Sequence, residues 1–180
     1  MTFIAGLDLA AKETRPSGLS IAENCKIKFI GKVYYDRDIL KHIVEFNVKV
    51  LAIDAPLSHA KTYRKVDLEM KRRGFKVLPP GWRYMRILVE RAIKLKSILE
   101  RYGIVVIETH PKSALKNSGY KDYKQLIKSH LILDELVLES LSKDEIDSLI
   151  CLLVAYYYVK GCVDKVEAED GVIYLLPTLC

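Results

Sequence analysis

The sequence has no long hydrophobic run, and it lacks the features of a secreted chain. No segment of about 18 or more uncharged apolar residues occurs, so no membrane-spanning helix is expected. The start of the chain passes directly into a strand-like segment, without the basic stretch, apolar stretch and cleavage site of a signal peptide. These absences predict a cytoplasmic protein with no membrane partner.

Paired cysteines are also absent, and amide side chains are scarce. The four cysteines form no Cys-x-x-Cys pair and have no histidine at zinc spacing, so neither a structural zinc site nor a disulfide framework is indicated and free thiols are expected. Glutamine occurs once and asparagine three times, against 29 Lys plus Arg and 23 Asp plus Glu. This balance is typical of heat-adapted proteins and predicts a thermophilic source, in which an intracellular disulfide is also compatible. The cysteines are Cys25, Cys151, Cys162 and Cys180.

The positive charge is concentrated in one segment of a chain that is otherwise slightly acidic. With 180 residues, half of them hydrophobic, residues 1–180 are predicted to form a single domain. Residues 57–103 hold thirteen Lys or Arg and four Asp or Glu, a balance of +9, which leaves 16 basic and 19 acidic residues, or −3, elsewhere. We interpret this segment as a basic helical insertion. It favours an anionic partner, nucleic acid before membrane, although a solvated helical surface explains the charge equally well.

The order of hydrophobic patterns predicts a mixed α/β fold. Short links join the first three strands, which indicates an antiparallel meander, and later strands separated by helices should be parallel. The sheet should be flanked by helices. The predicted strands are 3–10, 18–22, 26–35, 48–53, 104–107 and 172–176, and the predicted helices are 36–46, 61–73, 82–102, 125–139 and 142–160.

Acidic residues stand where apolar strands end. Asp8 lies inside the first apolar run, where an ionised carboxylate needs a cation or a hydrogen-bonding partner. Asp54 and Glu108 each end a mainly apolar run and precede a proline, and the carboxyl ends of parallel strands border the ligand crevice of an open sheet. For any one of these acids taken alone, a helix cap or an acceptor of backbone N–H groups is the better explanation. Three together favour a shared site.

A second pair of acids begins the last predicted helix. Ser142 and Glu145 form a capping box, which accounts for Glu145. Asp144 and Asp147 stand three residues apart, and Asp147 shares an apolar face with the residues one turn later, so both carboxylates should point inward. Unpaired they would repel each other, whereas a divalent cation would make them ligands. Mg²⁺ and Mn²⁺ prefer such oxygen-only sites.

Several motifs together resemble an uncharacterised family of predicted RNase H-like nucleases, domain-of-unknown-function family 429. They are GLDLA at the start, IDAP at 53–56, R-x-x-D at 64–67, LPPG at 78–81, E-x-HP at 108–111, D-x-x-D-S-L at 144–149 and the closing GVIYLLP. The resemblance implies a ribonuclease H-like mixed five-stranded sheet, the fold that also occurs in Holliday-junction resolvases. In that fold the acids lie on the first strand, the fourth strand and the last core helix, which here carry Asp8, Asp54, Asp144 and Asp147. Glu108 belongs to the family's own motif, and its role as ligand, supporting acceptor or binder of another group is left open.

Basic residues near these acids are candidates for phosphate binding. Lys12 and Arg15 follow the Asp8 strand and are predicted to meet a phosphate, although charged turn residues need no function. Arg64 and Asp67 are most simply a helical ion pair, with a phosphate clamp as the alternative for Arg64. Arg83 and Arg86 lie on the basic stripe of the 82–102 helix and are assigned to substrate binding.

His110 and the neighbouring aromatic residues have two readings each. His110, beside Glu108, is a candidate for proton transfer or for positioning water, and is equally compatible with a structural, hydrogen-bonded histidine. Trp82 and Tyr84 flank Arg83 in an arrangement able to stack bases, but Trp82 is expected to serve packing.

Three functions are compatible with this pattern. The favoured one is a Mg²⁺- or Mn²⁺-dependent nuclease or phosphodiesterase acting on nucleic acid, with Asp8, Asp54, Asp144 and Asp147 as metal ligands and with catalytic roles for these four, Glu108 and His110. The alternative is a non-catalytic nucleic-acid-binding or adaptor protein on the same fold. The third is an ATP binder of the actin and sugar-kinase class, which is disfavoured because Ala10, Ala11 and Lys12 replace the glycines of its phosphate loop. The choice of DNA or RNA and the formation of a homodimer are left open.

Overall fold

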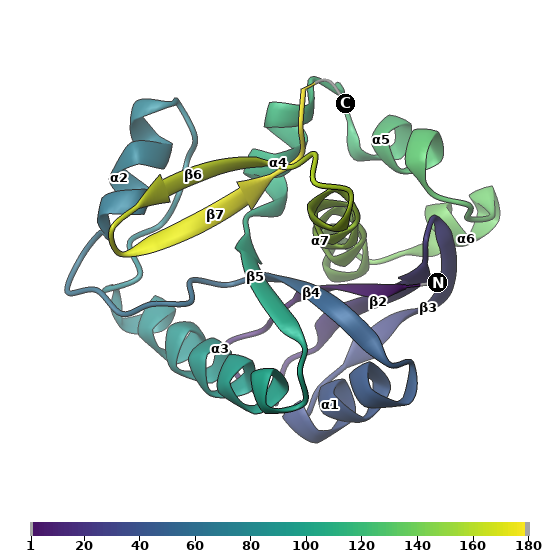
Figure 1. The fold of residues 1–180 in the computed structure, drawn as a ribbon, viewed down its shortest axis with the longest axis horizontal. Helices are drawn as coiled ribbons and strands as arrows, with labels where there is room; N and C mark the ends of the chain where they lie inside the picture. Colours follow the sequence, from purple (N-terminus) through teal and green to yellow (C-terminus); the bar gives the residue numbers. More distant parts are fainter. Residues whose placement is uncertain (1, 179–180) are drawn as a thin grey trace.

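The computed structural model describes residues 2–178 and is built around one seven-stranded sheet (Figure 1). The strand order is β3-β2-β1-β4-β5-β7-β6. The pairs β3/β2, β2/β1 and β7/β6 are antiparallel, and β1, β4, β5 and β7 run parallel. The strands are β1 (Phe3–Asp8), β2 (Ser17–Glu23), β3 (Lys26–Val33), β4 (Val48–Asp54), β5 (Val105–Thr109), β6 (Asp164–Ala168) and β7 (Gly171–Leu175).

The predicted mixed sheet is confirmed, but it has seven strands where the family resemblance implied five, because the predicted segment 172–176 joins the sheet as β7 and β6 adds a further strand. The sequence reading missed β6, which forms the outer edge by a hairpin with β7. Its sequence, DKVEA, buries only Val166, so it lacks the apolar run by which the other strands were identified. An edge strand needs to cover one face only, and charged side chains protect its open edge.

Helices cover both faces of the sheet, and their side chains divide the interior into two cores. Helices α1 and α3 lie on one face, and α7 lies against the other with α4 and α5 beside it (Figure 1). Strand alternation assigns Ala5, Leu7 and Ile53 to the α1/α3 core, and Ile4 and Ala52 to the α7 core. The helices are α1 (Asp36–Glu45), α2 (Lys65–Arg72), α3 (Arg83–Arg101), α4 (Pro111–Ser118), α5 (Tyr123–His130), α6 (Glu135–Ser140) and α7 (Lys143–Val159).

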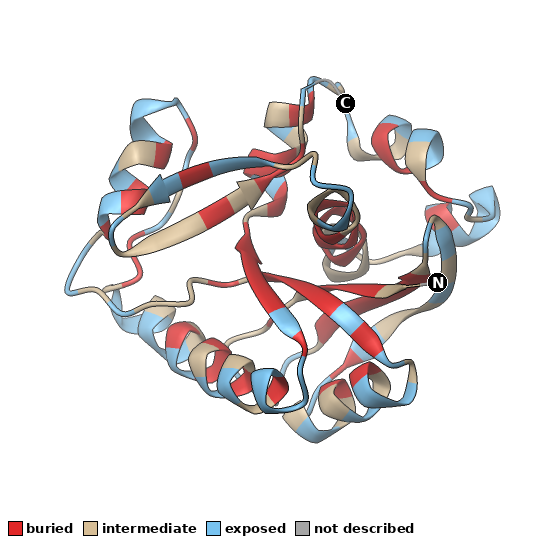
Figure 2. Cartoon of the chain, in the orientation of Figure 1, coloured by how far each residue is buried: buried red, intermediate tan, exposed pale blue. Residues whose placement is uncertain are grey.

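Helix α7 is the central helix of the molecule. Every residue from Ser148 to Ala155 is buried, which Figure 2 shows as the continuous red centre of this helix. The predicted capping box at its start is confirmed, with the backbone N–H of Ser142 donating to Glu145 at 2.9 Å. The first turn of α7 lies beside Gly18, the residue of β2 that pairs with Asp8 at the end of β1.

Several helix boundaries differ from the predicted ones. Helix α2 starts at Lys65, not at residue 61, since Arg64 is its extended N-cap. The sequence reading missed α4, where Pro111 occupies the first turn, a position that proline tolerates well. The single helix predicted over 125–139 is two helices, because the chain turns extended at Leu131 and α6 begins again after Asp134, whose side chain caps Leu136.

Within residues 2–178, no helix combines the length and apolar character needed to cross a membrane. Cys25 and Cys151 are free thiols, as predicted, whereas Cys162 is disulfide-bonded, so the expectation of free thiols is wrong there. Cys180 lies outside the described residues.

Candidate active site

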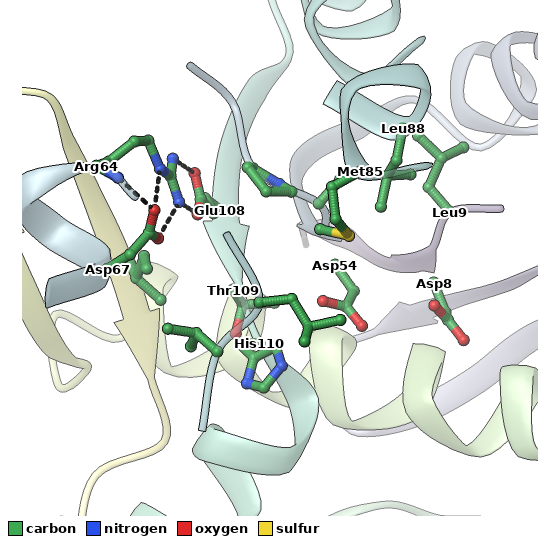
Figure 3. Close-up of a pocket in the computed structure, with 15 residues that line it drawn as sticks. Asp8, Leu9, Asp54, Arg64, Asp67, Met85, Leu88, Glu108, Thr109 and His110 are labelled. Carbon is green, nitrogen blue, oxygen red and sulfur yellow. Dashed lines mark hydrogen bonds and ion pairs between the residues drawn. The ribbon is translucent and has the colours of Figure 1, made fainter. Parts of the chain in front are cut away.

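Asp8 and Asp54 lie directly beside each other at the carboxyl ends of two neighbouring parallel strands. They are paired in the β1/β4 register, so their side chains lie on the same face of the sheet (Figure 3). Alternation from Ile4 and Ala52 puts both carboxylates on the α7 side. The prediction that these strand ends meet at one edge is therefore confirmed for this pair.

Two glycines, Gly6 in β1 and Gly18 in β2, let α7 lie close against these two strands. A Cβ added at Gly6 would lie 2.0 Å from the Ser148 carbonyl oxygen, and one at Gly18, the β2 partner of Asp8, would lie 1.9 Å from the Asp144 carbonyl oxygen. The hydroxyl of Ser20, also in β2, donates to the Ser148 carbonyl at 2.9 Å and links β2 to α7. This close contact brings the first turn of α7 to the strand ends.

Electrostatic coupling shows that the α7 acids share the environment of Asp8 and Asp54. Burial raises the pKa of Asp8 to about 7, with further increases from the charges of Asp147 and Asp144. Burial also raises the pKa of Asp54 well above its ordinary value, with Asp8 and Asp147 adding to the effect. The negative charges at this end of the sheet thus disfavour the ionisation of Asp8 and Asp54.

Lys143 is a cation whose charge acts on the pKa values of these acids. No role was assigned to it from the sequence. Its ammonium lies 3.1 Å from a carboxylate oxygen of Asp147, one helical turn further along α7. Its charge lowers the pKa values of both Asp8 and Asp54, against the larger effects that raise them. The signal in the sequence was the Lys-x-x-x-Asp spacing, which places the two side chains on one helix face.

The four aspartates suit a hard divalent cation by chemistry, although they are not gathered around a single point. Among residues 2–178, no three His, Cys, Asp or Glu side chains are grouped closely enough to hold a metal ion. The available donors are all carboxylate oxygens, which Mg²⁺ and Mn²⁺ prefer, and their mutual repulsion is the kind that a cation relieves. Ligation by Asp147 would compete with Lys143, whose ammonium contacts one of the two carboxylate oxygens.

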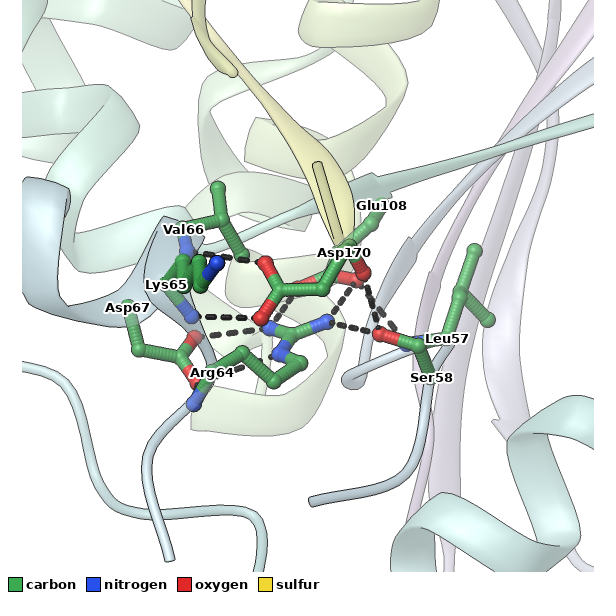
Figure 4. Close-up of polar contacts among 8 residues, drawn as sticks. All are labelled: Leu57, Ser58, Arg64, Lys65, Val66, Asp67, Glu108 and Asp170. Atoms are coloured by element: carbon green, nitrogen blue, oxygen red, sulfur yellow. Dashed lines mark hydrogen bonds and ion pairs between the residues drawn. The ribbon is translucent and has the colours of Figure 1, made fainter. Parts of the chain in front are cut away.

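Glu108 lies apart from the aspartates and belongs to a buried ion-pair network. It is in register with Ile53, so it lies on the sheet face opposite to Asp54. Its carboxylate accepts two hydrogen bonds from Arg64, at 2.8 and 2.5 Å, and one from the backbone of Leu57 at 2.8 Å (Figure 4). Burial raises its pKa, and Arg64 opposes this. Of the roles left open, the geometry matches a supporting acceptor.

Arg64 is buried, and all of its N–H groups are engaged within the protein. The guanidinium contacts Asp67, Glu108 and the Ser58 hydroxyl (Figure 4). Burial disfavours its charge, but the bonds to Glu108 and Asp67 outweigh this and raise its pKa. The predicted Arg64–Asp67 ion pair is confirmed, at 2.7 Å. No donor of Arg64 is left for a substrate phosphate in this arrangement.

Asp170 completes this network from the β6/β7 turn, and sequence reading missed it. Its carboxylate accepts the backbone N–H groups of Lys65 and Val66 at the start of α2, and its carbonyl accepts the Ser58 hydroxyl (Figure 4). The contacts span more than a hundred residues of sequence, so no local pattern indicates them. They tie the segment after β4 to the far edge of the sheet.

Two cavities meet at Asp8. The first, of about 200 Å³, is lined by Asp8, Asp54, Thr109, His110, the Arg64 network and an apolar wall from residues 77–88 (Figure 3). The second is an open groove of about 700 Å³, lined by Asp8, Asp144, Lys12, Arg15 and Tyr84. Asp147 lines a third hollow of about 350 Å³ together with Lys112 and Lys143.

The remaining predicted residues divide between these cavities and the outer surface. Lys12 and Arg15 lie in the groove, in the turn after β1. The Nδ1 atom of His110 is 2.7 Å from the Ser113 hydroxyl, and burial lowers the His110 pKa. Arg83 and Arg86 are exposed on α3 and line neither cavity, so the structure does not bring them to the acids. Trp82 is 58% exposed, so the expectation that it serves packing is not met.

Comparisons with known proteins identify the fold. No family model and no curated protein matches the chain. Among solved structures, T. thermophilus RuvC in complex with a Holliday junction substrate matches with a TM-score of 0.62 and 13% identity, over 89% of this chain and 98% of that one. A second Thermus thermophilus RuvC structure matches with a TM-score of 0.58 and 15% identity, over the same shares. The fold is ribonuclease H-like.

The ribonuclease H-like fold explains why acids from distant parts of the sequence approach one another. Asp8, Asp54 and the pair Asp144 and Asp147 lie on the first strand, the fourth strand and the last core helix, as the sequence resemblance implied. The family name suggested by the motifs is matched by no family model and stays a prediction.

Proposed function

We propose that this protein is a divalent-metal-dependent nuclease that hydrolyses phosphodiester bonds in nucleic acid. The observation that carries the proposal is the direct pairing of Asp8 with Asp54 at the ends of β1 and β4, facing the first turn of α7. The likeness of the fold to RuvC, a protein whose structure contains a Holliday junction substrate, supports nucleic acid as the substrate class. A similar fold does not by itself establish an activity. The proposal therefore depends on the arrangement of the aspartates.

Asp8, Asp54, Asp144 and Asp147 would hold the cation, Mg²⁺ or Mn²⁺. A bound divalent ion supplies Lewis-acid stabilisation of phosphoryl charge and makes a water a better nucleophile at neutral pH. The four carboxylates would orient the ion, and its positive charge would favour the ionised forms of Asp8 and Asp54, whose pKa values are raised in the metal-free protein. Lys143, whose ammonium contacts one carboxylate oxygen of Asp147, would lie close enough to this ion to contact a phosphate oxygen of the substrate.

The chain's other groups would bind and orient the substrate. Lys12 and Arg15 lie in the groove beside Asp8, where cationic side chains contact the sugar-phosphate backbone without reading sequence. Neutral His110 lines the cavity beside Asp54, where its imidazole can hold or transfer a proton at Nε2. Glu108 is proposed to act indirectly, by fixing Arg64 and the segment after Asp54.

The decisive experiment combines metal binding with cleavage. We expect calorimetry to detect Mg²⁺ or Mn²⁺ binding to the wild-type protein, and expect binding to be lost in Asp8→Asn and Asp54→Asn. Cleavage of labelled DNA and RNA, single-stranded, duplex and branched, should require the same ions and vanish in Asp54→Asn. Wild-type protein that binds neither ion, with or without oligonucleotide present, would contradict the proposal.

A non-catalytic nucleic-acid-binding protein is the second candidate, favoured by the Lys143–Asp147 ion pair. A protein side chain already neutralises one acid of the set, and no three acids are gathered for a metal ion within residues 2–178. Salt-sensitive oligonucleotide binding that Asp54→Asn leaves unchanged, without cleavage, would support this candidate. Whether the substrate is DNA or RNA, and whether the protein forms a homodimer, stay predictions to be tested with the same substrates and by sedimentation.

A further inference from the structure

We propose that the cavity beside Asp54 receives a single nucleobase turned out of its strand. The inference rests on the proposed function and adds the substrate class to it: a nucleic acid whose nucleotide at the cleavage position is unstacked. The size of the cavity, its walls and its position between the acids and the basic groove all match such a base.

The cavity volume limits the ligand to about one ring system. At about 200 Å³ it is smaller than the roughly 300–1,000 Å³ typical of pockets for drug-sized molecules. A duplex or a run of stacked nucleotides does not fit into such a space. Asp8 and Asp54 line it, so whatever occupies it lies next to the proposed reacting phosphate (Figure 3).

One wall of the cavity is apolar and comes from the segment before α3 and its first turns. It consists of Val77, Leu78, Met85 and Leu88, and Figure 3 shows Met85 and Leu88 beside the two aspartates. Apolar side chains against the flat faces of a base are the usual means by which proteins hold a flipped nucleotide. Methionine adapts its shape to such a surface. A hydrated metal ion or a phosphate alone gains nothing from this wall.

The cavity has few polar groups opposite the apolar wall, and several of them already form hydrogen bonds within the protein. Arg64, Asp67 and Glu108 bond to one another, so they are occupied with each other and close that end of the cavity (Figure 3). Thr109 donates its hydroxyl to the Tyr174 carbonyl and keeps acceptor capacity, and the Nδ1 atom of His110 is engaged by Ser113. The groups left for the edge of a base are the Thr109 oxygen and the Nε2 atom of His110.

Asp8 stands at the boundary between this cavity and the basic groove. The groove of about 700 Å³ contains Lys12, Arg15 and the exposed ring of Tyr84, which suits a sugar-phosphate backbone and a neighbouring base. A strand lying in the groove would bring one phosphate to the acids, and its base would then face the apolar cavity. The base of the unstacked nucleotide would thus lie in the apolar cavity, and the neighbouring nucleotides would lie in the groove.

The test compares ligands that differ only in the base. Binding of AMP, UMP and ribose 5-phosphate to the metal-free protein is measured by calorimetry or ligand-observed NMR. We expect at least one mononucleotide to bind ten times or more tightly than ribose 5-phosphate, which has the same sugar and phosphate. In Leu78→Trp, which fills the mouth of the cavity, this difference should disappear. Leu136→Trp, which changes an exposed leucine on α6 that does not line the cavity, should retain it.

Two further measurements separate the possible failures. Met85→Trp repeats the test from another side of the cavity, and thermal melting of each variant verifies its folding, so loss of folding in one variant leaves the other as the test. Equal binding of the three ligands, no mononucleotide binding at all, or unchanged selectivity in both folded variants would overturn the inference. Base-dependent binding without any metal-dependent cleavage would support the cavity assignment and contradict the nuclease. Metal-dependent cleavage without base-dependent binding would do the reverse.

Discussion

The ammonium of Lys143 lies 3.1 Å from the carboxylate of Asp147 on the turn of α7 that faces Asp8 and Asp54. A protein cation thus stands among four acids at the place where a divalent cation is proposed. Its charge lowers the pKa of Asp8, against the burial and acidic neighbours that raise it to about 7. The balance of charge at this end of the sheet therefore depends on a single exposed lysine.

Removing that lysine should change the titration of Asp8. In Lys143→Met, we expect the Asp8 pKa to rise further above about 7, since the positive charge that opposes this rise is lost. The measurement is a carboxyl ¹³C NMR titration of metal-free protein. Lys165→Met, which removes an exposed lysine paired with Glu167 on the edge strand, is the control and should leave Asp8 unchanged. An Asp8 pKa that falls in Lys143→Met would contradict the proposed charge balance.

The stability of the metal-free protein should fall as pH rises. The pKa of Asp8 is raised from 3.8 to about 7 in the folded state, so the unfolded state releases this proton at lower pH. Protonated Asp8 therefore contributes to the free energy of unfolding. This contribution is complete below about pH 4 and is lost as the pH rises through about 7. Asp8→Asn should flatten this dependence and raise the melting temperature at pH 8. Asp164→Asn on exposed β6 is the control. Melting temperatures across pH 4–8, with and without Mg²⁺, test this, and an equal slope in Asp8→Asn would contradict it.

The buried network around Arg64 should contribute strongly to stability. Arg64→Met leaves the carboxylates of Asp67 and Glu108 buried without their cation, and breaking a buried pair in this way typically costs about 3–5 kcal/mol. Urea unfolding measures the change. Arg73→Met removes an exposed arginine that contacts Glu69, and a much smaller loss is expected because solvent screens this pair. Similar losses in the two variants would show that the network is not important for stability.

The contact between β1 and α7 should not tolerate a methyl group. In Gly6→Ala the new Cβ would lie 2.0 Å from a backbone oxygen of α7, so the helix must shift, at a cost of about 1–3 kcal/mol or more. We also expect the Asp8 pKa to fall, because the α7 acids would move away. Gly31→Ala, which meets only the tip of the Phe29 ring at 3.3 Å, is the matched control. A variant with unchanged stability and Asp8 titration would contradict this account of the site.

Sequence patterns predicted the elements whose local chemistry is strong. The apolar runs of β1, β4 and β5, the helical repeat of α3 and the capping box of α7 each report their structure within a few residues. Sequence patterns did not predict β6, which is charged and half-exposed. They also missed the break between α5 and α6, where one helix ends and a new cap starts another.

The sequence by itself determined a mixed α/β fold and the acids at the ends of its strands, since periodicity and the placement of a charge in an apolar run are local properties. Only the tertiary structure decided which acids meet. Strand register pairs Asp8 with Asp54, and two glycines bring α7 to them. The same alternation turns Glu108 to the opposite face and commits it to Arg64. Such partnerships join residues tens of positions apart, where no local pattern records them.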